Sequence, residues 1–404
     1  MHINTRLTPT LITLLIAASE IAICFNSVLL PDIKGAFQIN EATAQSTVSI
    51  GLFALGFSGV VYGAISDCVG RKPMFLISIA VFCIASILCV NAQRIEVFLF
   101  ARFLQGIGSG ASWIVGNACL KDIFFQDAYT RVMNYIHAIA GIIPAVAPIL
   151  GSKLAVIIGW RSCFSVLAIV GAITWLGIFF FQQETLKQKK QLSAALIIDE
   201  YKTLAKNFKF QIYLVIKVIS VMIIFVETSN NSLILVDYLG VSPSAYGYYV
   251  LPGFIAYIIA NLISSYLTGK VNINHLLAVG LVFIILSQIA TLLLPSTLQS
   301  SPLAVQLAKA STYMGLGFIF GNATAMVVSS ASNCPGSASA IMIGLEMLFS
   351  SIGISLESIF FDGSIVPVTQ FTLVSAIIAM SVLYLSRDFL QQVGTGSNPP
   401  SAHG

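Results

Sequence analysis

The chain has 404 residues, of which 57% are apolar and 9% are charged, and its mean hydropathy is +0.91. Soluble domains carry about a quarter charged residues, and disordered chains or disulfide scaffolds are polar or rich in cysteine, so the composition excludes these classes. The net charge of +4 comes from 20 basic residues spread along the chain, which excludes a soluble nucleic-acid-binding protein. The composition therefore indicates an integral membrane protein.

Twelve apolar runs reach the length of about 20 residues that a membrane-spanning helix needs. They are mostly uncharged and do not alternate, so they predict helices and not barrel strands. The first run is too long for a signal peptide and lacks a small-residue cleavage site, so we expect it to be an uncleaved span. The predicted spans are 9–31, 45–66, 74–92, 95–119, 134–158, 162–182, 211–236, 245–268, 274–294, 303–329, 338–359 and 365–386.

Basic residues outside the spans favour one side of the predicted membrane, which orients that side toward the cytoplasm. The other side holds only Lys34, Arg94, Lys153 and Arg161. The basic side holds Arg6, Arg71, Lys72, Lys121, Arg131, Lys187, Lys189, Lys190, Lys202, Lys206, Lys209, Lys270 and Arg387. Both termini are therefore expected in the cytoplasm, as an even number of spans requires.

A polar segment, 183–210, divides the spans into two groups of six. We expect an N-terminal six-helix bundle in residues 1–182, this segment as a basic cytoplasmic linker, and a C-terminal six-helix bundle in residues 211–386. Residues 387–404 are predicted to form a disordered cytoplasmic tail. Two such bundles suggest halves related by an axis normal to the membrane, with the substrate path between them.

The loop between the second and third spans carries glycines and charges at fixed spacing. It reads Gly63-Ala-Ile-Ser-Asp67-Cys-Val-Gly70-Arg71-Lys72-Pro73. Gly70 suits a tight turn with positive φ, and the neighbouring charges can latch helix ends together. A topology signal alone would explain Arg71 and Lys72 but not Gly63 and Asp67.

Two further motifs lie inside spans. The fourth span reads Arg102-Phe-Leu-Gln105-Gly106-Ile-Gly108, and the fifth reads Gly141-Ile-Ile-Pro144-Ala-Val-Ala147-Pro148-Ile-Leu-Gly151. An arginine within a span is costly unless it is paired or hydrated, so Arg102 is either functional or a structural residue that bonds Gln105 or the backbone of the first span. Each proline removes a backbone hydrogen bond and can bend its helix.

These segments resemble the cytoplasmic signature loop, the Arg-x-x-Gln-Gly motif and the antiporter motif of the major facilitator superfamily. Gly159-Trp160-Arg161 after the two prolines, and Val241-Ser-Pro243 with Tyr246-Gly247-Tyr248-Tyr249, are most similar to its twelve-span drug–proton antiporters of the bicyclomycin-resistance type. The resemblance implies an all-α major facilitator fold of twelve transmembrane helices and drug–proton antiport. It also implies conformational gating by Gly63, Asp67, Gly70, Arg71, Lys72, Gly141, Pro144, Pro148 and Gly151.

A proton-coupled transporter needs a carboxylate inside the membrane. The acids within the predicted spans are Glu20, Glu227, Glu346 and Glu357, and the cations are Arg102, Lys217 and Lys309. Glu20 lies about eleven residues into the first span, which is ~16 Å along a helix and near the middle of a bilayer. We therefore predict proton coupling at Glu20, with Arg102 as its electrostatic partner.

The first span departs from the related transporters in one respect. The bicyclomycin-resistance type usually has an aspartate four residues before the proline that ends this span. Counting back from Pro31 gives Ser27, with Asn26 beside it, so the proton site of that branch is absent here.

Polar residues within the spans cannot face lipid without cost, so they are predicted to line a substrate cavity or to bond neighbouring helices. The run Glu227-Thr-Ser-Asn230-Asn231-Ser232 in the seventh span should line the cavity, break the helix, or both. Two deep acids, Glu227 and Glu346, and two bases in the C-terminal spans favour a polar or zwitterionic substrate with an apolar part. The predicted cavity residues are Asn26, Ser27, Gln105, Lys217, Glu227, Asn230, Asn231, Asn322 and Glu346.

No cofactor and no metal are expected. The seven cysteines lack paired metal-ligand spacing, and no glycine-rich phosphate loop is present, so we do not expect ATP to drive transport. No nucleophile–base cluster is present either, so we do not expect an enzyme. The expected partners are a small-molecule substrate, protons and membrane lipid, without nucleic acid, and we expect a monomer.

The sequence thus predicts a proton-coupled multidrug or metabolite efflux transporter that works by alternating access across the bacterial inner membrane. One alternative is a proton-coupled importer or exporter of a specific polar solute such as a siderophore. An alternative of another class is a non-transporting membrane receptor or scaffold. It is disfavoured because the sequence has no soluble domain and such a protein would not need charges at the midplane.

Overall fold

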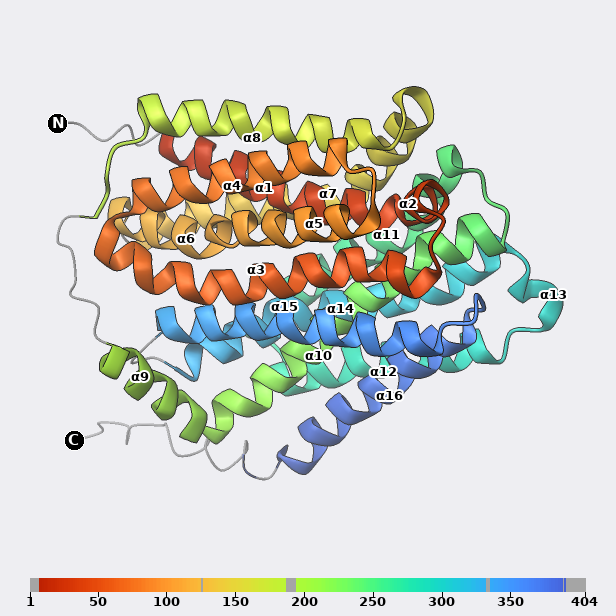
Figure 1. The fold of residues 1–404 in the computed structure, drawn as a ribbon. Coiled ribbons are helices and arrows are strands. Elements are labelled where there is room, and N and C mark those ends of the chain that lie inside the picture. The colour runs from red at the N-terminus through yellow and green to blue at the C-terminus, as the bar shows by residue number, and fades with distance from the viewer. Residues whose placement is uncertain (1–6, 125, 187–193, 332–334, 388, 390–404) are drawn as a thin grey trace, which may run out of the picture.

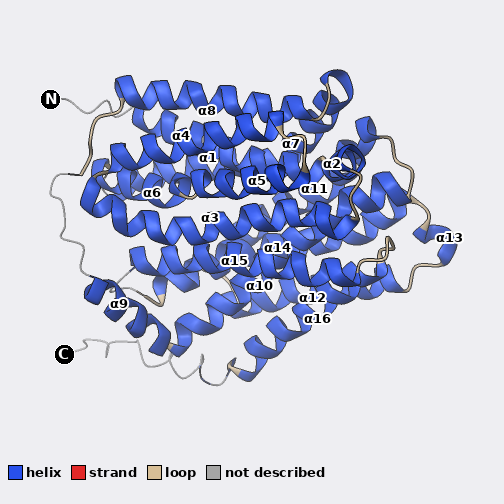
Figure 2. Cartoon of the chain, viewed as in Figure 1, coloured by secondary structure: helices blue, strands red, loops and turns tan. Residues whose placement is uncertain are grey.

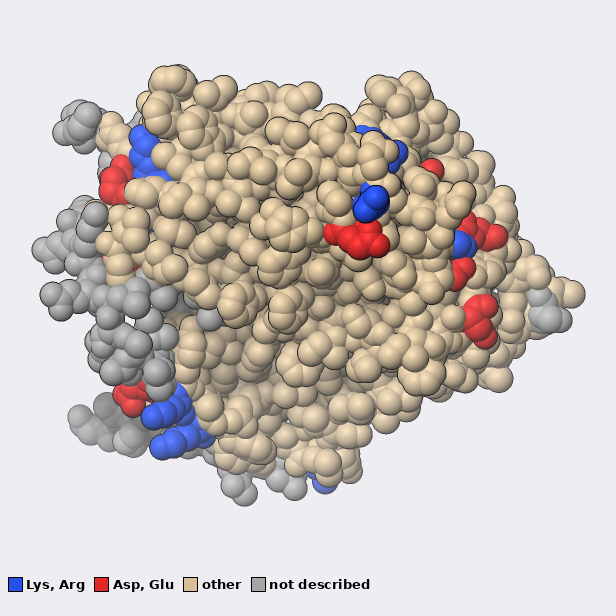
Figure 3. All heavy atoms as spheres, in the orientation of Figure 1, with Lys and Arg blue, Asp and Glu red and all other residues tan. Residues whose placement is uncertain are grey.

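The computed structural model describes residues 7–389 apart from 125, 187–193, 332–334 and 388. Within these ranges the fold is helical, and β structure is limited to one bridge between Thr268 and Val271 (Figure 2). The long helices run side by side, and on the face shown in Figure 3 charged side chains gather toward the ends of the bundle. Large apolar side chains such as Ile157, Phe180 and Leu262 are exposed, as a helical surface in lipid requires.

The first eight helices form what we call the N-terminal half (Figure 1). Their bounds are α1 Leu7–Val28, α2 Leu30–Phe37, α3 Glu41–Val69, α4 Arg71–Asn91, α5 Ile95–Ser109, α6 Ala111–Ile123, α7 Gln126–Ile158 and α8 Arg161–Phe181. Two buried apolar clusters hold them together: one is centred on Phe98, Trp160 and Phe164, and the other on Phe75 and Ile79.

The helices from α10 onward form what we call the C-terminal half. Their bounds are α10 Phe208–Ser232, η1 Leu233–Tyr238, α11 Pro243–Leu267, α12 Ile273–Leu292, α13 Ser296–Gln299, α14 Pro302–Ser329, α15 Pro335–Phe360 and α16 Val366–Leu385. A short helix, α9 Ala194–Lys206, precedes them within the predicted linker. The predicted tail lies, from residue 390 on, outside the described residues.

Ten helices are long and apolar enough to cross a membrane, among the residues that the structure describes. The predicted fourth span is divided at Gly110 into α5 and α6, and the predicted fifth span lies in α7, with Ile142–Ile158 as its shorter apolar part. A Cβ on Gly110 would clash with Ser58 Oγ, so the break brings this backbone against α3. The twelve predicted spans therefore correspond to ten long helices, the α5–α6 pair and α7.

The two halves meet along α3 with α15 and along α7 with α11. A Cβ on Gly56 would lie 2.8 Å from the carbonyl oxygen of Gly344, so α3 and α15 cross in close backbone contact. At the end of the bundle that carries α2 and η1, a shared apolar cluster joins Leu30 and Val48 to Leu233 and Ile354. We call this end, opposite α9 in Figure 1, the closed end.

Candidate functional site

Glu20 projects from the middle of α1 toward α6. Its side chain is part-buried, and its Oε1 accepts a hydrogen bond of 2.9 Å from Trp113 Nε1. At the preceding residue of each helix, Ser19 Oγ and Ser112 Oγ lie 2.6 Å apart, so α1 and α6 are joined by two polar contacts. Glu20 takes part in none of the ion pairs found among the described residues. Glu20 thus lies deep in a span, and its side chain is still partly accessible.

Arg102, on α5, is held by groups other than a carboxylate. Its Nε donates to the carbonyl oxygen of Thr47 at 3.2 Å, and its Nη1 donates to Gln105 Oε1. Gln105 Nε2 in turn donates to Ser86 Oγ at 2.8 Å. Gly51 makes room for the guanidinium group, because a Cβ there would lie 3.1 Å from Nη2. The contacts of Arg102 therefore join α3, α4 and α5, and its predicted action on Glu20 remains a prediction.

Asn26 and Ser27 lie in the last turn of α1. Asn26 Nδ2 donates to Thr47 Oγ1 at 3.0 Å, and both side chains are fully buried. The carbonyl oxygen of Ser27 accepts a hydrogen bond of 2.5 Å from Ser232 Oγ, on the last residue of α10. The bond between Ser27 and Ser232 therefore links α1 of the N-terminal half to α10 of the C-terminal half.

Glu227 and Lys309 form a buried ion pair inside the C-terminal half. The distance from Lys309 Nζ to Glu227 Oε2 is 2.7 Å, and each residue is 2% exposed. Glu227 Oε1 also accepts from Thr372 Oγ1 at 3.1 Å and from Gln288 Nε2 at 3.4 Å. Four helices, α10, α12, α14 and α16, thus supply one network in which both charges are neutralised, as burial requires.

A second buried pair, Lys217 with Glu346, is looser. The nitrogen–oxygen distance is 3.8 Å, and Lys217 Nζ lies 4.1 Å from the centre of the Phe320 ring. Glu346 Oε1 is buried without a hydrogen-bond partner. This incompletely bonded pair could still gain contacts from a bound polar group.

The other cavity residues in the C-terminal half bond neighbouring helices. Asn322 Nδ2 donates to Ser264 Oγ at 2.7 Å, which joins α14 to α11. Asn231 exchanges two hydrogen bonds with Gln306, with N···O distances of 3.4 and 2.7 Å. All nine predicted cavity residues are buried in this conformation. The polar run in the seventh span does change the helix, since the π-helix η1 begins directly after Ser232.

Asn230 lies at the centre of a polar chain that crosses between the halves. Its Oδ1 accepts a hydrogen bond of 2.7 Å from Gln45 Nε2 of α3. Its Nδ2 donates to Glu357 Oε2 of α15 at 2.6 Å. Sequence analysis listed Glu357 only as one of the acids within the spans and did not single out Gln45, because nothing in a single sequence shows that residues 127 or 185 positions apart are in contact.

The closed end is also fastened by charges. Lys34 of α2 lies 2.7 Å from Glu41 Oε1 and 2.9 Å from Asp237 Oδ2 of η1, and Tyr238 donates to Glu41 at 3.0 Å. Burial lowers the pKa of Lys34, but the hydrogen bonds and charges of Glu41 and Asp237 outweigh it and hold that pKa above its usual range. Lys34, which served the sequence analysis only as a topology signal, thus bridges the two halves.

We expect Lys34→Gln to lower the free energy of unfolding by about 1 kcal/mol, the size of a partly exposed ion-pair network. Because the folded-state pKa of this cation is raised, its contribution is fully present below the ordinary lysine pKa and is lost only as pH rises through the raised value. The wild type and variant should therefore differ equally at about pH 6 and 8, and the difference should begin to shrink only above the ordinary lysine pKa of about 10.4. Thermal unfolding in detergent measures this, and a difference that vanished near neutral pH would contradict it.

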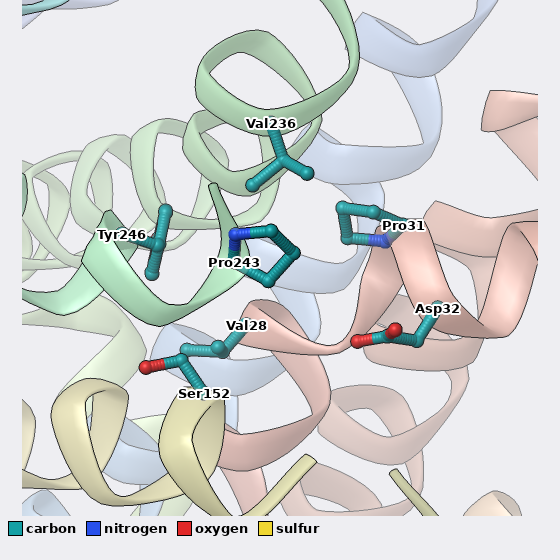
Figure 4. A pocket seen from close by; sticks show the side chains of 7 residues that line it. All are labelled: Val28, Pro31, Asp32, Ser152, Val236, Pro243 and Tyr246. Atoms are coloured by element: carbon teal, nitrogen blue, oxygen red, sulfur yellow. The ribbon is translucent and has the colours of Figure 1, made fainter. Parts of the chain in front are cut away.

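A small pocket at the closed end is lined by both halves (Figure 4). Its lining residues are Val28, Pro31, Asp32, Ser152, Val236, Pro243 and Tyr246. Burial, and secondarily the charge of Asp237, raise the pKa of Asp32. Asp32 lies half-buried beside residues of the opposite half.

The predicted gating loop is fixed by three acids: Asp67 within the loop, Asp122 of α6, and Glu184 just after α8. Arg71 pairs with Asp67 at 2.6 Å and with Asp122, near the end of α6, at 3.3 Å. The Glu184 carboxylate accepts from the backbone N–H groups of Arg71 and Lys72, at 2.9 and 3.2 Å, and so caps the start of α4. Gly70, with φ +121°, makes the turn between α3 and α4 as predicted.

Gly70→Ala should destabilise the protein more than Gly269→Ala. Both glycines have positive φ, +121° and +83°, so each alanine strains the backbone by about 1–3 kcal/mol. Only at Gly70 would the new Cβ also clash with the Glu184 carboxylate, whereas nothing lies within 4 Å at Gly269. Thermal unfolding of the two variants checks this, and equal losses would contradict the role assigned to Glu184.

The antiporter motif lies in α7. Pro144 and Pro148 are inside this helix, which continues to Ile158, and Gly141 precedes them. A Cβ on Gly151 would lie 2.9 Å from Phe25 Cδ1, so α7 packs closely on α1 there. On its other side α7 meets α11, where a Cβ on Gly247 would lie 2.6 Å from Ile149 Cα. The motif therefore borders the contact between the halves, which suits the predicted gating role.

The chain matches the model of one protein family. The family is described as "Major Facilitator Superfamily", and the match covers residues 10–356. The matched residues run from α1 into α15 and so include helices of both halves.

Curated relatives match over part of their length. The bicyclomycin resistance protein homolog of Haemophilus influenzae is 25% identical over 251 residues, which is 62% of this chain and 63% of the relative. The multidrug resistance protein MdtL of Salmonella paratyphi A is 30% identical over 220 residues, which is 54% of this chain and 55% of the relative. The matched region thus spans little more than half of these relatives.

Solved structures match over nearly the whole chain and show the fold. A bacterial homolog of the human lysosomal transporter Spinster superposes with a TM-score of 0.73 at 16% identity and covers 95% of this chain and 97% of its own. A POT family transporter in complex with 5-aminolevulinic acid has a TM-score of 0.77 at 11% identity and covers 96% of each chain.

Proposed function

Because the chain is a multi-pass membrane protein that belongs to the Major Facilitator Superfamily, we propose that it exports small molecules by alternating access in exchange for protons. The observation that carries the proposal is Glu20, a carboxyl group in the middle of an apolar span, part-buried and bonded to Trp113 rather than to a cation. Such a group has no structural need for its charge and is a site for proton binding. The names of the matched relatives, which refer to drug resistance, support drugs as one substrate class.

In the proposed cycle, Glu20 is ionised while the cavity faces the cytoplasm and a substrate binds. The halves then rock about the cavity, the substrate leaves on the other side, and a proton on Glu20 allows the return. Arg102, fixed by Thr47 and Gln105, contributes a positive charge to the same half. The glycine and proline motifs of the α3–α4 loop and α7 serve as gates. The proposed setting is the bacterial inner membrane, with both termini in the cytoplasm and the protein acting as a monomer in contact with lipid.

The proposed domain division has two six-helix bundles, 1–182 and 211–386, joined by the linker 183–210. In each bundle, buried apolar clusters pack helices of that bundle together, as in the cluster around Leu281 and Leu316. The contacts between bundles include polar bonds that can be broken and remade, such as that between Lys34 and Asp237. This distribution supports movement of the bundles as units.

A second candidate is a proton-coupled importer or exporter of a specific polar solute, such as a siderophore. The observation that favours it is the loose Lys217–Glu346 pair, in which Glu346 Oε1 lacks a hydrogen-bond partner. A substrate with both an acceptor and a donor group could complete this pair, whereas a purely lipophilic cation would not need the lysine.

Purified protein in proteoliposomes tests the proposal. An imposed pH gradient should drive a panel of polar and lipophilic compounds against their concentration gradient, and each transported compound should move protons in the opposite direction. Proton movement in the same direction as the substrate would instead establish the symport form of the second candidate. Transport that is indifferent to the pH gradient, or no transport across the panel, would overturn the proposal.

A further inference from the structure

We propose that Glu357 binds a proton when the two halves close, so that closure of the end carrying α2 and η1 responds to pH. The proposal rests on the proposed function for its place in a transport cycle, but closure itself can be measured without transport. Glu357 is distinct from Glu20, the carboxyl group assigned above to the transported proton.

The geometry places Glu357 at the inner end of the polar chain between the halves. It is 1% exposed, its Oε2 accepts from Asn230 Nδ2 at 2.6 Å, and its Oε1 is buried without a hydrogen-bond partner. Asn230 Oδ1 accepts from Gln45 Nε2, and Gln45 belongs to the other half. Contact between the halves therefore covers this carboxyl group, since Gln45 lies on α3 and α3 packs along α15.

The surrounding charges leave Glu357 without an ion-pair partner among the described residues. The charged groups that act on it are Glu227 from α10, Lys309 from α14 and Asp362 from the loop after α15. Lys309 is already paired with Glu227 at 2.7 Å, so its charge is compensated. From α3 the facing side chain is the neutral Gln45. A buried carboxylate in this setting is costly, and a bound proton removes the cost.

Closure and proton binding therefore favour each other. When the halves separate at this end, Gln45 moves away with α3, water reaches Asn230 and Glu357, and the carboxyl group releases its proton to the solution on that side. When they close, the carboxylate takes up one proton from the same solution and becomes a neutral acid. Acid outside would then promote closure of this end, which is the return step of an exporter.

Two other carboxyl groups could be mistaken for this site. Asp32 lies half-buried in the pocket between the halves, and Asp362 is exposed and accepts from its own loop at Ser364 N. Asp32→Asn and Asp362→Asn remove the same charge as Glu357→Gln and so serve as matched controls. Neither control disturbs the chain from Gln45 to Glu357.

The test measures a distance across the closed end. Spin labels are placed at Ala36 of α2 and Ser244 of α11, both exposed, in protein whose native cysteines are replaced by serine and which is held in nanodiscs without substrate. Between about pH 5 and 9, the ratio of closed to open protein should fall by up to about tenfold per pH unit, the limit for one proton. Glu357→Gln should stay closed at every pH, and both control variants should keep the pH dependence.

Three outcomes would overturn the inference: a pH-independent distance in the wild type, an unchanged slope in Glu357→Gln, or loss of the slope in Asp32→Asn. If Glu357→Gln fails to fold, infrared difference spectra of the wild type provide a second test. The carbonyl band of a protonated carboxyl group should appear on acidification and shift in Glu357→Asp, and its absence would also overturn the inference. Failure of the transport assay with pH-dependent closure intact would count against the proposed function and not against this site.

Discussion

Lys309→Met should lower the free energy of unfolding by about 3–5 kcal/mol, because it leaves the Glu227 carboxylate buried and unpaired. Glu227 and Lys309 are each 2% exposed, and the distance from Lys309 Nζ to Glu227 Oε2 is 2.7 Å. Water therefore cannot replace the lost partner without rearrangement of the surrounding side chains. Glu227→Gln should be destabilising for the complementary reason. Chemical or thermal unfolding in detergent measures both effects.

The double variant Glu227→Gln/Lys309→Met tests whether the pair is the cause. It contains no buried charge at this place, so it should lose less stability than either single variant. Lys270→Met, which removes an exposed lysine, provides the control and should change stability by less than about 0.5 kcal/mol. Additive losses in the double variant would show that the two side chains act separately.

Glu20→Gln should abolish transport driven by a pH gradient, reducing it to the level of vesicles without the protein. Glutamine keeps the size of the side chain and can still accept a hydrogen bond from Trp113, but it cannot bind and release a proton. The variant should therefore fold normally and still exchange substrate between the two sides when no gradient is imposed. Proteoliposomes loaded with a transported compound separate these two activities.

Two variants make this result specific. Glu20→Asp retains a titratable group and should recover part of the coupled transport, whereas Glu96→Gln alters an exposed acid at the start of α5 and should have no effect. Coupled transport that survives in Glu20→Gln would assign the transported proton to another carboxyl group.

The sequence predicted the helices well because their signal is local. A run of about 20 apolar residues must cross a bilayer as a helix, whatever its neighbours are. The two details that were missed depend on contacts. The break at Gly110 arises where α5 and α6 lie against Ser58 of α3, and α2 forms a separate helix after Val28. Neither the break at Gly110 nor the end of α1 at Val28 leaves a mark on the composition of the span.

The candidate site shows the same limit more strongly. The sequence named nearly every buried charge, since a charge within an apolar run is visible as such. Apart from Gln105, which was named as a possible partner of Arg102 and does bond it, the sequence could not give their partners, because these depend on how each helix is rotated and how deep each residue lies. Lys309 is 82 positions from Glu227, and Gln45 is 185 positions from Asn230.

Composition and hydropathy by themselves determined that this is a membrane protein of twelve spans, and the loop and span motifs indicated its superfamily. These properties follow from local physics: the cost of exposing backbone to lipid and the conformations that glycine and proline allow. Only the tertiary structure decided which acids have an ion-pair partner among the described residues, which have none there, and which bonds join the halves at the closed end. Those depend on distances of a few ångströms between helices that are far apart in the chain, and electrostatic energies in a buried site change steeply over such distances.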